Sequence, residues 1–136
     1  MDSEELKRRT KKFAHDCVKL ALLLPNTYLG RHIKGQLIRA STSVAANYRA
    51  ACLAQSKASF IAKISIVIEE VDESLFWLEF INDEKLISFE ELEPLLIESN
   101  ELVSIFVSSR KTAQKRKDQC FDIDYSSIVN QQSSIH

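Results

Sequence analysis

The sequence predicts an all-α protein, an antiparallel up-down-up-down four-helix bundle. The chain of 136 residues holds only two Gly and two Pro, which leaves little material for the turns of a β-rich fold. Apolar residues make up 45% of it and recur three and four positions apart in four segments, as on one face of a helix. This length suits one domain. We expect the bundle over residues 1–117 and a flexible tail over residues 118–136.

The first helix is expected over about residues 3–24. It starts at Ser3, and the acidic residues that follow suit the positive end of a helix dipole. Pro25 ends the pattern. The apolar stripe of this segment is Phe13, Cys17, Leu20 and Leu24.

The second helix is expected over about residues 29–54. Its stripe is Ile33, Leu37, Ala40, Val44, Asn47 and Ala51. Residues 40–46 carry only small side chains and Val, so a neighbouring helix is expected to approach closely there. Asn47 is polar within the stripe. We interpret it as a structural polar residue that fixes helix register, and the alternative is a polar contact for a ligand.

The third helix is expected over about residues 56–81, with Ser56 as its N-cap. Its stripe is Ile61, Ile64, Ile68, Val71, Leu75 and Leu78. The fourth is expected over about residues 88–115, where Ser88 and Glu91 have the spacing of a capping box. Its stripe is Leu92, Leu95, Ser99, Leu102, Phe106 and Ser109.

No catalytic, metal-binding or cofactor-binding group is predicted. A di-metal site in a bundle needs Glu-x-x-His pairs, and no histidine here follows a glutamate at that spacing. In the triplet His15-Asp16-Cys17, successive side chains point about 100° apart, so we interpret it as two surface residues and a core cysteine. Cys52 and Cys120 form no zinc-type pair with Cys17.

A cytoplasmic protein that does not enter a membrane is expected. The sparse, odd number of cysteines fits a reducing compartment. No secretory signal pattern opens the chain, and no apolar run is long enough to span a bilayer.

The third helix carries a second apolar set, of which Ile66, Trp77 and Phe80 lie roughly opposite the core stripe. A helix of a monomeric bundle keeps that face polar, and aromatic residues there are typical of a subunit interface. The alternative is an ordinary scatter of surface aromatics. The predicted oligomer interface is Ile66, Glu70, Glu73, Phe76, Trp77 and Phe80.

Charge is expected to separate along the bundle although the net charge is only −1. The acidic end is Glu79, Asp83, Glu84, Glu90, Glu91 and Glu93. The opposite end collects most of the Lys and Arg residues, and such an end could bind nucleic acid by releasing counterions from phosphates. The alternative is a solubilising surface. The predicted nucleic-acid-binding residues are Lys7, Arg8, Arg9, Lys11, Lys12, Arg49, Lys57, Lys63, Arg110, Lys111, Lys115, Arg116 and Lys117.

The C-terminal segment leaves a choice open. Its polar composition favours a flexible tail, and the alternative is a short arm that docks on a neighbour. The apolar residues of such an arm would be Phe121, Ile123, Tyr125 and Ile128.

Three stretches carry a family resemblance: GQLIRASTSVAANYRAA (35–51), SKASFIAK (56–63) and EEVDESLFWL (69–78). They resemble the bacterial S23, or 23S rRNA intervening-sequence, protein family, with a likeness over about residues 8–115. The resemblance implies a four-helix bundle, a ring-shaped homopentamer and no catalytic residues. Some members are encoded in insertions within ribosomal RNA genes, and a related branch of retroelement accessory proteins binds a reverse transcriptase and nucleic acid.

Two departures from the family pattern matter. Many relatives have Ala-Glu-Gly where residues 49–51 read Arg-Ala-Ala, which places any contact of the missing Glu in doubt. The accessory branch is strongly basic, whereas this chain is near neutral.

The predicted function is a non-enzymatic, homo-oligomeric module that binds RNA, DNA or a nucleic-acid enzyme such as a reverse transcriptase. The alternative is a protein-interaction or assembly module that does not bind nucleic acid. A small-molecule enzyme is disfavoured because no acid–base or nucleophile set is present.

Overall fold

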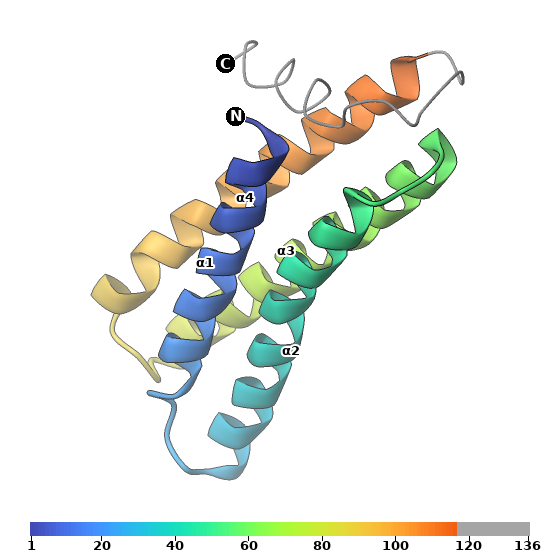
Figure 1. Cartoon of the computed structure of the whole chain (residues 1–136). Coiled ribbons are helices and arrows are strands. Elements are labelled where there is room, and N and C mark those ends of the chain that lie inside the picture. The colour runs from blue at the N-terminus through green and yellow to red at the C-terminus, as the bar shows by residue number, and fades with distance from the viewer. Residues whose placement is uncertain (117–136) are drawn as a thin grey trace.

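The computed structural model describes residues 1–116, and it confirms the all-α antiparallel bundle. The helices are α1 (Ser3–Ala21), α2 (Tyr28–Ala51), α3 (Lys57–Asp83) and α4 (Phe89–Lys115). Each helix packs against the next along the chain, and α4 also contacts α1 (Figure 1). The tail predicted over residues 118–136, and Lys117 before it, lie outside the described residues.

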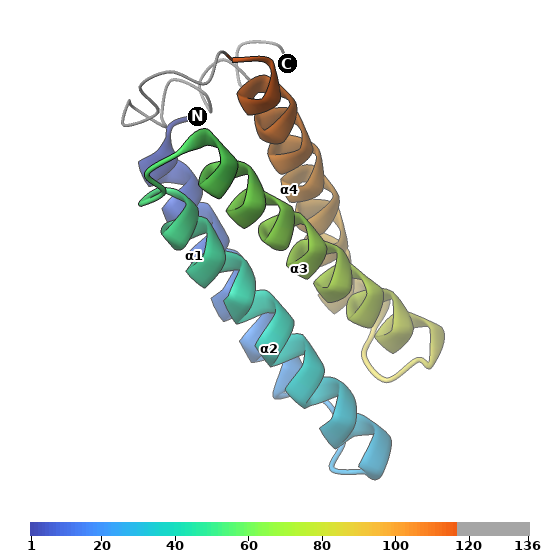
Figure 2. The same cartoon turned by 90° about the vertical axis from the view of Figure 1, so that its right-hand side faces the viewer.

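The two ends of the bundle carry different turns. The α1–α2 and α3–α4 turns lie together, while the N-terminus, the α2–α3 turn and the end of α4 lie at the opposite end (Figures 1 and 2). The contact between α1 and α4 is less extensive than the other three helix contacts. Arg9 reinforces it, because its Nε and Nη2 each donate to Glu98 at 2.7 Å and Nη2 also lies 3.2 Å from Glu101.

Side chains cap α1 and α3 at the starts that the sequence predicts, and the start of α4 needs one correction. Ser56 is the N-cap of α3 as expected, and its Oγ accepts from the Ser59 N–H at 3.1 Å. α1 begins at Ser3 as expected, and its N-cap is Asp2, whose Oδ1 accepts from the Glu5 N–H at 2.8 Å. Ser88 caps α4 without a side-chain hydrogen bond, so the predicted capping box is wrong. Its backbone carbonyl instead accepts from the Glu91 N–H.

Both α1 and α2 end three residues earlier than predicted, at Ala21 and Ala51. Beyond each helix end the backbone forms tighter turns, in which an N–H donates to the carbonyl three residues earlier, as helix C-termini often do. The Leu24 N–H donates to the Ala21 carbonyl and the Ala54 N–H to the Ala51 carbonyl, each at 3.1 Å. Leu24 and Ala54 remain buried, which explains why the apolar pattern runs past both helix ends.

The stripes of α1 and α4 are confirmed, since every residue assigned to them is buried. The stripe of α2 needs one correction. Tyr48 is 1% exposed and occupies the core, whereas Asn47 is half-buried at its edge. Asn47 Nδ2 donates to the Ser43 carbonyl of the same helix at 2.9 Å. A shift of one position rotates a side chain by about 100°, so Asn47 is not in the helical seam.

The stripe predicted for α3 is partly wrong. Ile61, Ile68 and Leu75 are half-buried. The buried residues of α3 are Phe60, Ile64, Val67, Val71, Ser74, Leu78 and Ile81. Because α3 is apolar on more than one face, periodicity alone could not decide which face packs inward.

None of the four helices combines the length and the apolar content needed to cross a bilayer. Within residues 1–116, no three His, Cys, Asp or Glu side chains converge to hold a metal ion.

Candidate nucleic-acid interface

A groove of about 770 Å³ runs along the outer surface where α1 and α2 meet. It lies near the end that carries the N-terminus. From α1 it is lined by Glu4, Lys7, Arg8, Lys11, Ala14, His15 and Val18, and from α2 by Thr42, Ala45, Ala46 and Arg49.

The groove follows from the spacing of small and long side chains. The lining residues of α1 recur three or four positions apart, so they form one strip beside the core stripe. Opposite them, Thr42, Ala45 and Ala46 are too short to fill the space between the helices. The small-residue segment 40–46 therefore has two roles, because Ala40, Ser41 and Val44 are buried in the core while Thr42, Ala45 and Ala46 leave the surface hollow.

The rim of the groove carries unpaired positive charge. Arg8, Lys11 and Arg49 are exposed, and no acidic side chain of residues 1–116 pairs with them. Lys7 is different, because its Nζ lies 3.0 Å from Glu4 Oε1. Three free cations around an apolar floor can hold an anionic chain, provided that part of that chain is itself apolar or aromatic.

Several residues predicted to bind nucleic acid are already paired with acidic side chains of the bundle. Arg9 is held by Glu98 and Glu101, and the hydrogen bond with Glu98 is the main cause that raises its pKa. Lys12 pairs with Asp16 at 2.6 Å, which raises the pKa of Lys12.

Two further basic residues connect elements at the same end. Lys57 donates to the Arg116 carbonyl at 2.6 Å, and Arg110 donates to Ser65 Oγ at 3.2 Å. We therefore assign Lys57 and Arg110, like Arg9, contacts that stabilise the bundle.

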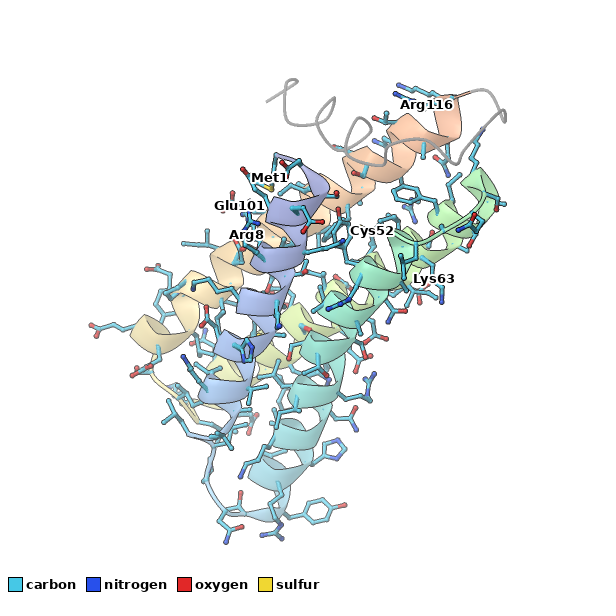
Figure 3. All side chains as sticks on the ribbon, in the orientation of Figure 1. Met1, Arg8, Cys52, Lys63, Glu101 and Arg116 are labelled. Atoms are coloured by element: carbon cyan, nitrogen blue, oxygen red, sulfur yellow. The ribbon has the colours of Figure 1, made fainter. Side chains whose placement is uncertain are left out.

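The remaining basic residues share the end of the bundle but not the groove. Figure 3 shows Arg8 on α1, Lys63 on α3 and Arg116 at the end of α4, all toward the end that carries the N-terminus. Lys111 and Lys115 also belong to the last turns of α4. The basic end is thus two separate patches, one in the α1–α2 groove and one on α3 and α4.

The triplet 15–17 diverges as the helix geometry predicts. His15 is exposed and lines the groove, and Asp16 faces Lys12. Cys17 is fully buried, and that burial raises the pKa of its thiol. These three side chains do not form one site.

The predicted oligomer face lies beside α2, and its acids are already paired. Arg39 of α2 forms ion pairs with Glu70, at 3.3 Å, and with Glu73. Trp77 Nε1 donates to Glu73 Oε2 at 3.3 Å, and the Trp77 ring meets the His32 ring edge-on at 5.6 Å. These contacts tie α3 to α2 within one chain.

One aromatic residue of that face remains open to solvent. Phe76 is 50% exposed, and its ring centroid lies 4.9 Å from that of Trp77 and 6.0 Å from that of Phe80. Trp77 and Phe80 pack partly against the core, and Ile66 is half-buried. The face presents an aromatic cluster with Phe76 at its surface.

Comparison with known proteins decides the family. The model of the 23S rRNA-intervening sequence protein family matches residues 3–108. The chain belongs to this family. A solved structure of a protein of unknown function from the S23 ribosomal protein family of Bacteroides thetaiotaomicron is 34% identical, with a TM-score of 0.73. The alignment covers 78% of this chain and 98% of that one. Among curated proteins, none matches the sequence.

The match to the 23S rRNA-intervening sequence protein family ends at residue 108 and so covers the α1–α2 groove and most of α4. The predicted nucleic-acid-binding residues include all four Lys and Arg side chains that line the groove, Lys7, Arg8, Lys11 and Arg49, but the groove itself was not predicted. The available signal was the run of small residues at positions 42, 45 and 46, which we interpreted as a place of close helix approach.

Proposed function

We propose that this 23S rRNA-intervening sequence protein is a non-enzymatic, homo-oligomeric module that binds single-stranded nucleic acid in the α1–α2 groove. The observation that carries the proposal is the set of unpaired cations, Arg8, Lys11 and Arg49, around an open hollow. Each can neutralise a phosphate and release its counterion. The apolar floor can contact bases, which a single strand exposes and a duplex does not.

The groove can be tested by removing its charge without changing its shape much. A triple variant with Arg8→Gln, Lys11→Gln and Arg49→Gln is expected to bind a short fluorescein-labelled single-stranded RNA at least about tenfold more weakly at low salt. Because each lost phosphate contact removes about 0.7 from the slope of log K against log salt, that slope should fall by about 2. Fluorescence anisotropy over a salt series measures both quantities.

A matched triple variant controls for net charge. Lys19→Gln, Arg31→Gln and Lys34→Gln remove the same charge from α1 and α2 but lie outside the groove. This variant should keep the parent slope. Equal weakening by both triples, or no RNA binding by the parent at low salt, would contradict the proposed groove.

Self-association is the second part of the proposal, and the exposed aromatic ring of Phe76 supports it. Phe76→Glu is expected to yield a smaller species in light scattering with unchanged helical circular dichroism, because a charge at an interface core is costly. Phe76 is a sharper probe than Trp77, whose substitution would also break contacts to Glu73 and His32.

Phe89→Glu is the control for Phe76→Glu. Phe89 is equally exposed, at 50%, but lies at the first turn of α4 outside the aromatic cluster. If Phe76→Glu keeps the parent mass, this face is not the interface. If the parent assembles but binds no RNA, the chain fits the alternative of a protein-interaction module.

A further inference from the structure

The sequence after α4 matches the α1–α2 groove in its charge and its apolar content. Residues 118–125 read DQCFDIDY, in which Asp122 and Asp124 alternate with Phe121, Ile123 and Tyr125. Successive side chains of an extended segment point to opposite sides. In an extended conformation the three apolar side chains share one side and the two aspartates the other. We propose that residues 118–128 of the chain dock in its own α1–α2 groove.

The groove offers both kinds of surface that such a segment requires. Val18, Ala45 and Ala46 provide apolar contacts on the floor. Arg8, Lys11 and Arg49 surround this floor with long, exposed side chains that no carboxylate of residues 1–116 neutralises. A segment with aspartates alone would use only the rim, and one with apolar residues alone would leave the cations unpaired.

α4 ends at the same end of the bundle as the groove, so the segment begins near the site that it is proposed to fill. Arg116 and Arg8 both lie toward the end that carries the N-terminus (Figure 3). The Arg116 carbonyl is held by Lys57 Nζ at 2.6 Å, which fixes the point from which the segment departs. A helix with its side chains is about 10–12 Å wide, so a bundle of two by two helices is about 20–25 Å across.

The length of the segment is sufficient for docking within one chain. The ten residues from Arg116 to Ser126 span up to about 33–36 Å when extended. This exceeds the width of the bundle, so the segment can pass over the end of the molecule and still lay Phe121, Ile123 and Tyr125 along the groove. A second copy is not needed to supply it.

Docking has a regulatory consequence for the proposed function. The aspartates of the segment and the phosphates of a nucleic acid would compete for the same three cations. The segment would act as a built-in competitor, and Asp118→Asn, Asp122→Asn and Asp124→Asn together would tighten RNA binding. This consequence rests on the proposed function, whereas the docking itself does not.

Disulfide trapping in the full-length chain tests the docking directly. Cys52→Ser and Cys120→Ser leave only Cys17, which is fully buried. Ala46→Cys in the groove and Ser127→Cys, which shares the side of Phe121, Ile123 and Tyr125 in an extended segment, then place one thiol at each site. Mild oxidation by copper phenanthroline in air at low protein concentration should join them within one chain. Intact-mass and peptide analysis detect the loss of two hydrogens and the linked peptides.

The matched control places the first thiol at the same end of the bundle but on another face. Ala58→Cys replaces an exposed alanine in the first turn of α3, outside the groove. With Ser127→Cys it should give at least about fivefold less intrachain disulfide at early times. The three aspartate-to-asparagine substitutions should lower the Ala46→Cys yield toward this control value.

Three outcomes would overturn the proposal. They are equal yields at the two alanine positions, no effect of the aspartate substitutions, and disulfides that form mainly between chains and disappear on dilution. RNA plays no part in this measurement. Trapping without RNA binding would keep the docking and reject the proposed function, and RNA binding without trapping would do the reverse.

Discussion

Phe106→Ala is expected to lower the free energy of unfolding by about 3–5 kcal/mol, the range for truncating a buried aromatic side chain. Phe106 on α4 is completely buried, and its ring centroid lies 5.2 Å from that of Tyr48 on α2. These helices are diagonal partners in the bundle, and their backbones do not approach each other. The two rings therefore meet across the centre of the bundle, and truncation of Phe106 is expected to leave a cavity there.

Urea unfolding followed by circular dichroism measures this loss, at a fixed protein concentration so that assembly contributes equally. Tyr48→Phe is the matched control, since it keeps both rings. Within residues 1–116 the buried Tyr48 hydroxyl has no nitrogen or oxygen partner and meets only the weakly hydrogen-bonding thiol of Cys52. Its removal should therefore change stability by less than about 0.5 kcal/mol or increase it. A loss below about 1 kcal/mol for Phe106→Ala would show that the centre of the bundle repacks.

The contrast between α4 and α3 shows what periodicity can predict. All six residues assigned to the α4 stripe are buried, because polar residues occupy most other positions of that helix and leave one possible inner face. In α3, apolar residues such as Ile61 and Ile68 compete with Val67 for the inner position. The choice among them depends on how α2 and α4 pack against α3, and that information is not local to the segment.

The sequence predicts at which end of the bundle the candidate site residues lie, but not which of them pair with an acidic side chain. The up-down topology places Arg8, Arg9 and Lys11 at one end, as the sequence indicates. Only the packing of α1 on α4 brings Glu98 to Arg9, across 89 positions in the chain, and removes that cation from the surface. The neighbouring Arg8 faces α2 instead, where Ala45 and Ala46 leave it unpaired. Burial and partners of a charge thus depend on contacts distant in sequence.

The two glycines provide the second large prediction, because they have opposite surroundings in the same helix. Gly30→Ala is expected to lower the free energy of unfolding by about 3 kcal/mol, toward the upper part of the range for overpacking. A Cβ at Gly30 would overlap the carbonyl oxygen of Pro25, which belongs to the α1–α2 turn. The Gly30 N–H also donates to Thr27 Oγ1 at 3.0 Å, so the helix start and the turn cannot move apart without losing the cap.

Gly35→Ala is the matched substitution one and a half turns further along α2. Apart from its own helix backbone and chain neighbours, no atom of residues 1–116 would lie within 4 Å of a Cβ at Gly35. Only the helix propensity changes, and stability should rise by about 1 kcal/mol. Thermal unfolding of the two variants beside the parent should therefore give shifts of opposite sign. If Gly30→Ala were also stabilising, the Pro25 turn would be free to move, and its close approach to Gly30 would not be what holds the start of α2 against the end of α1.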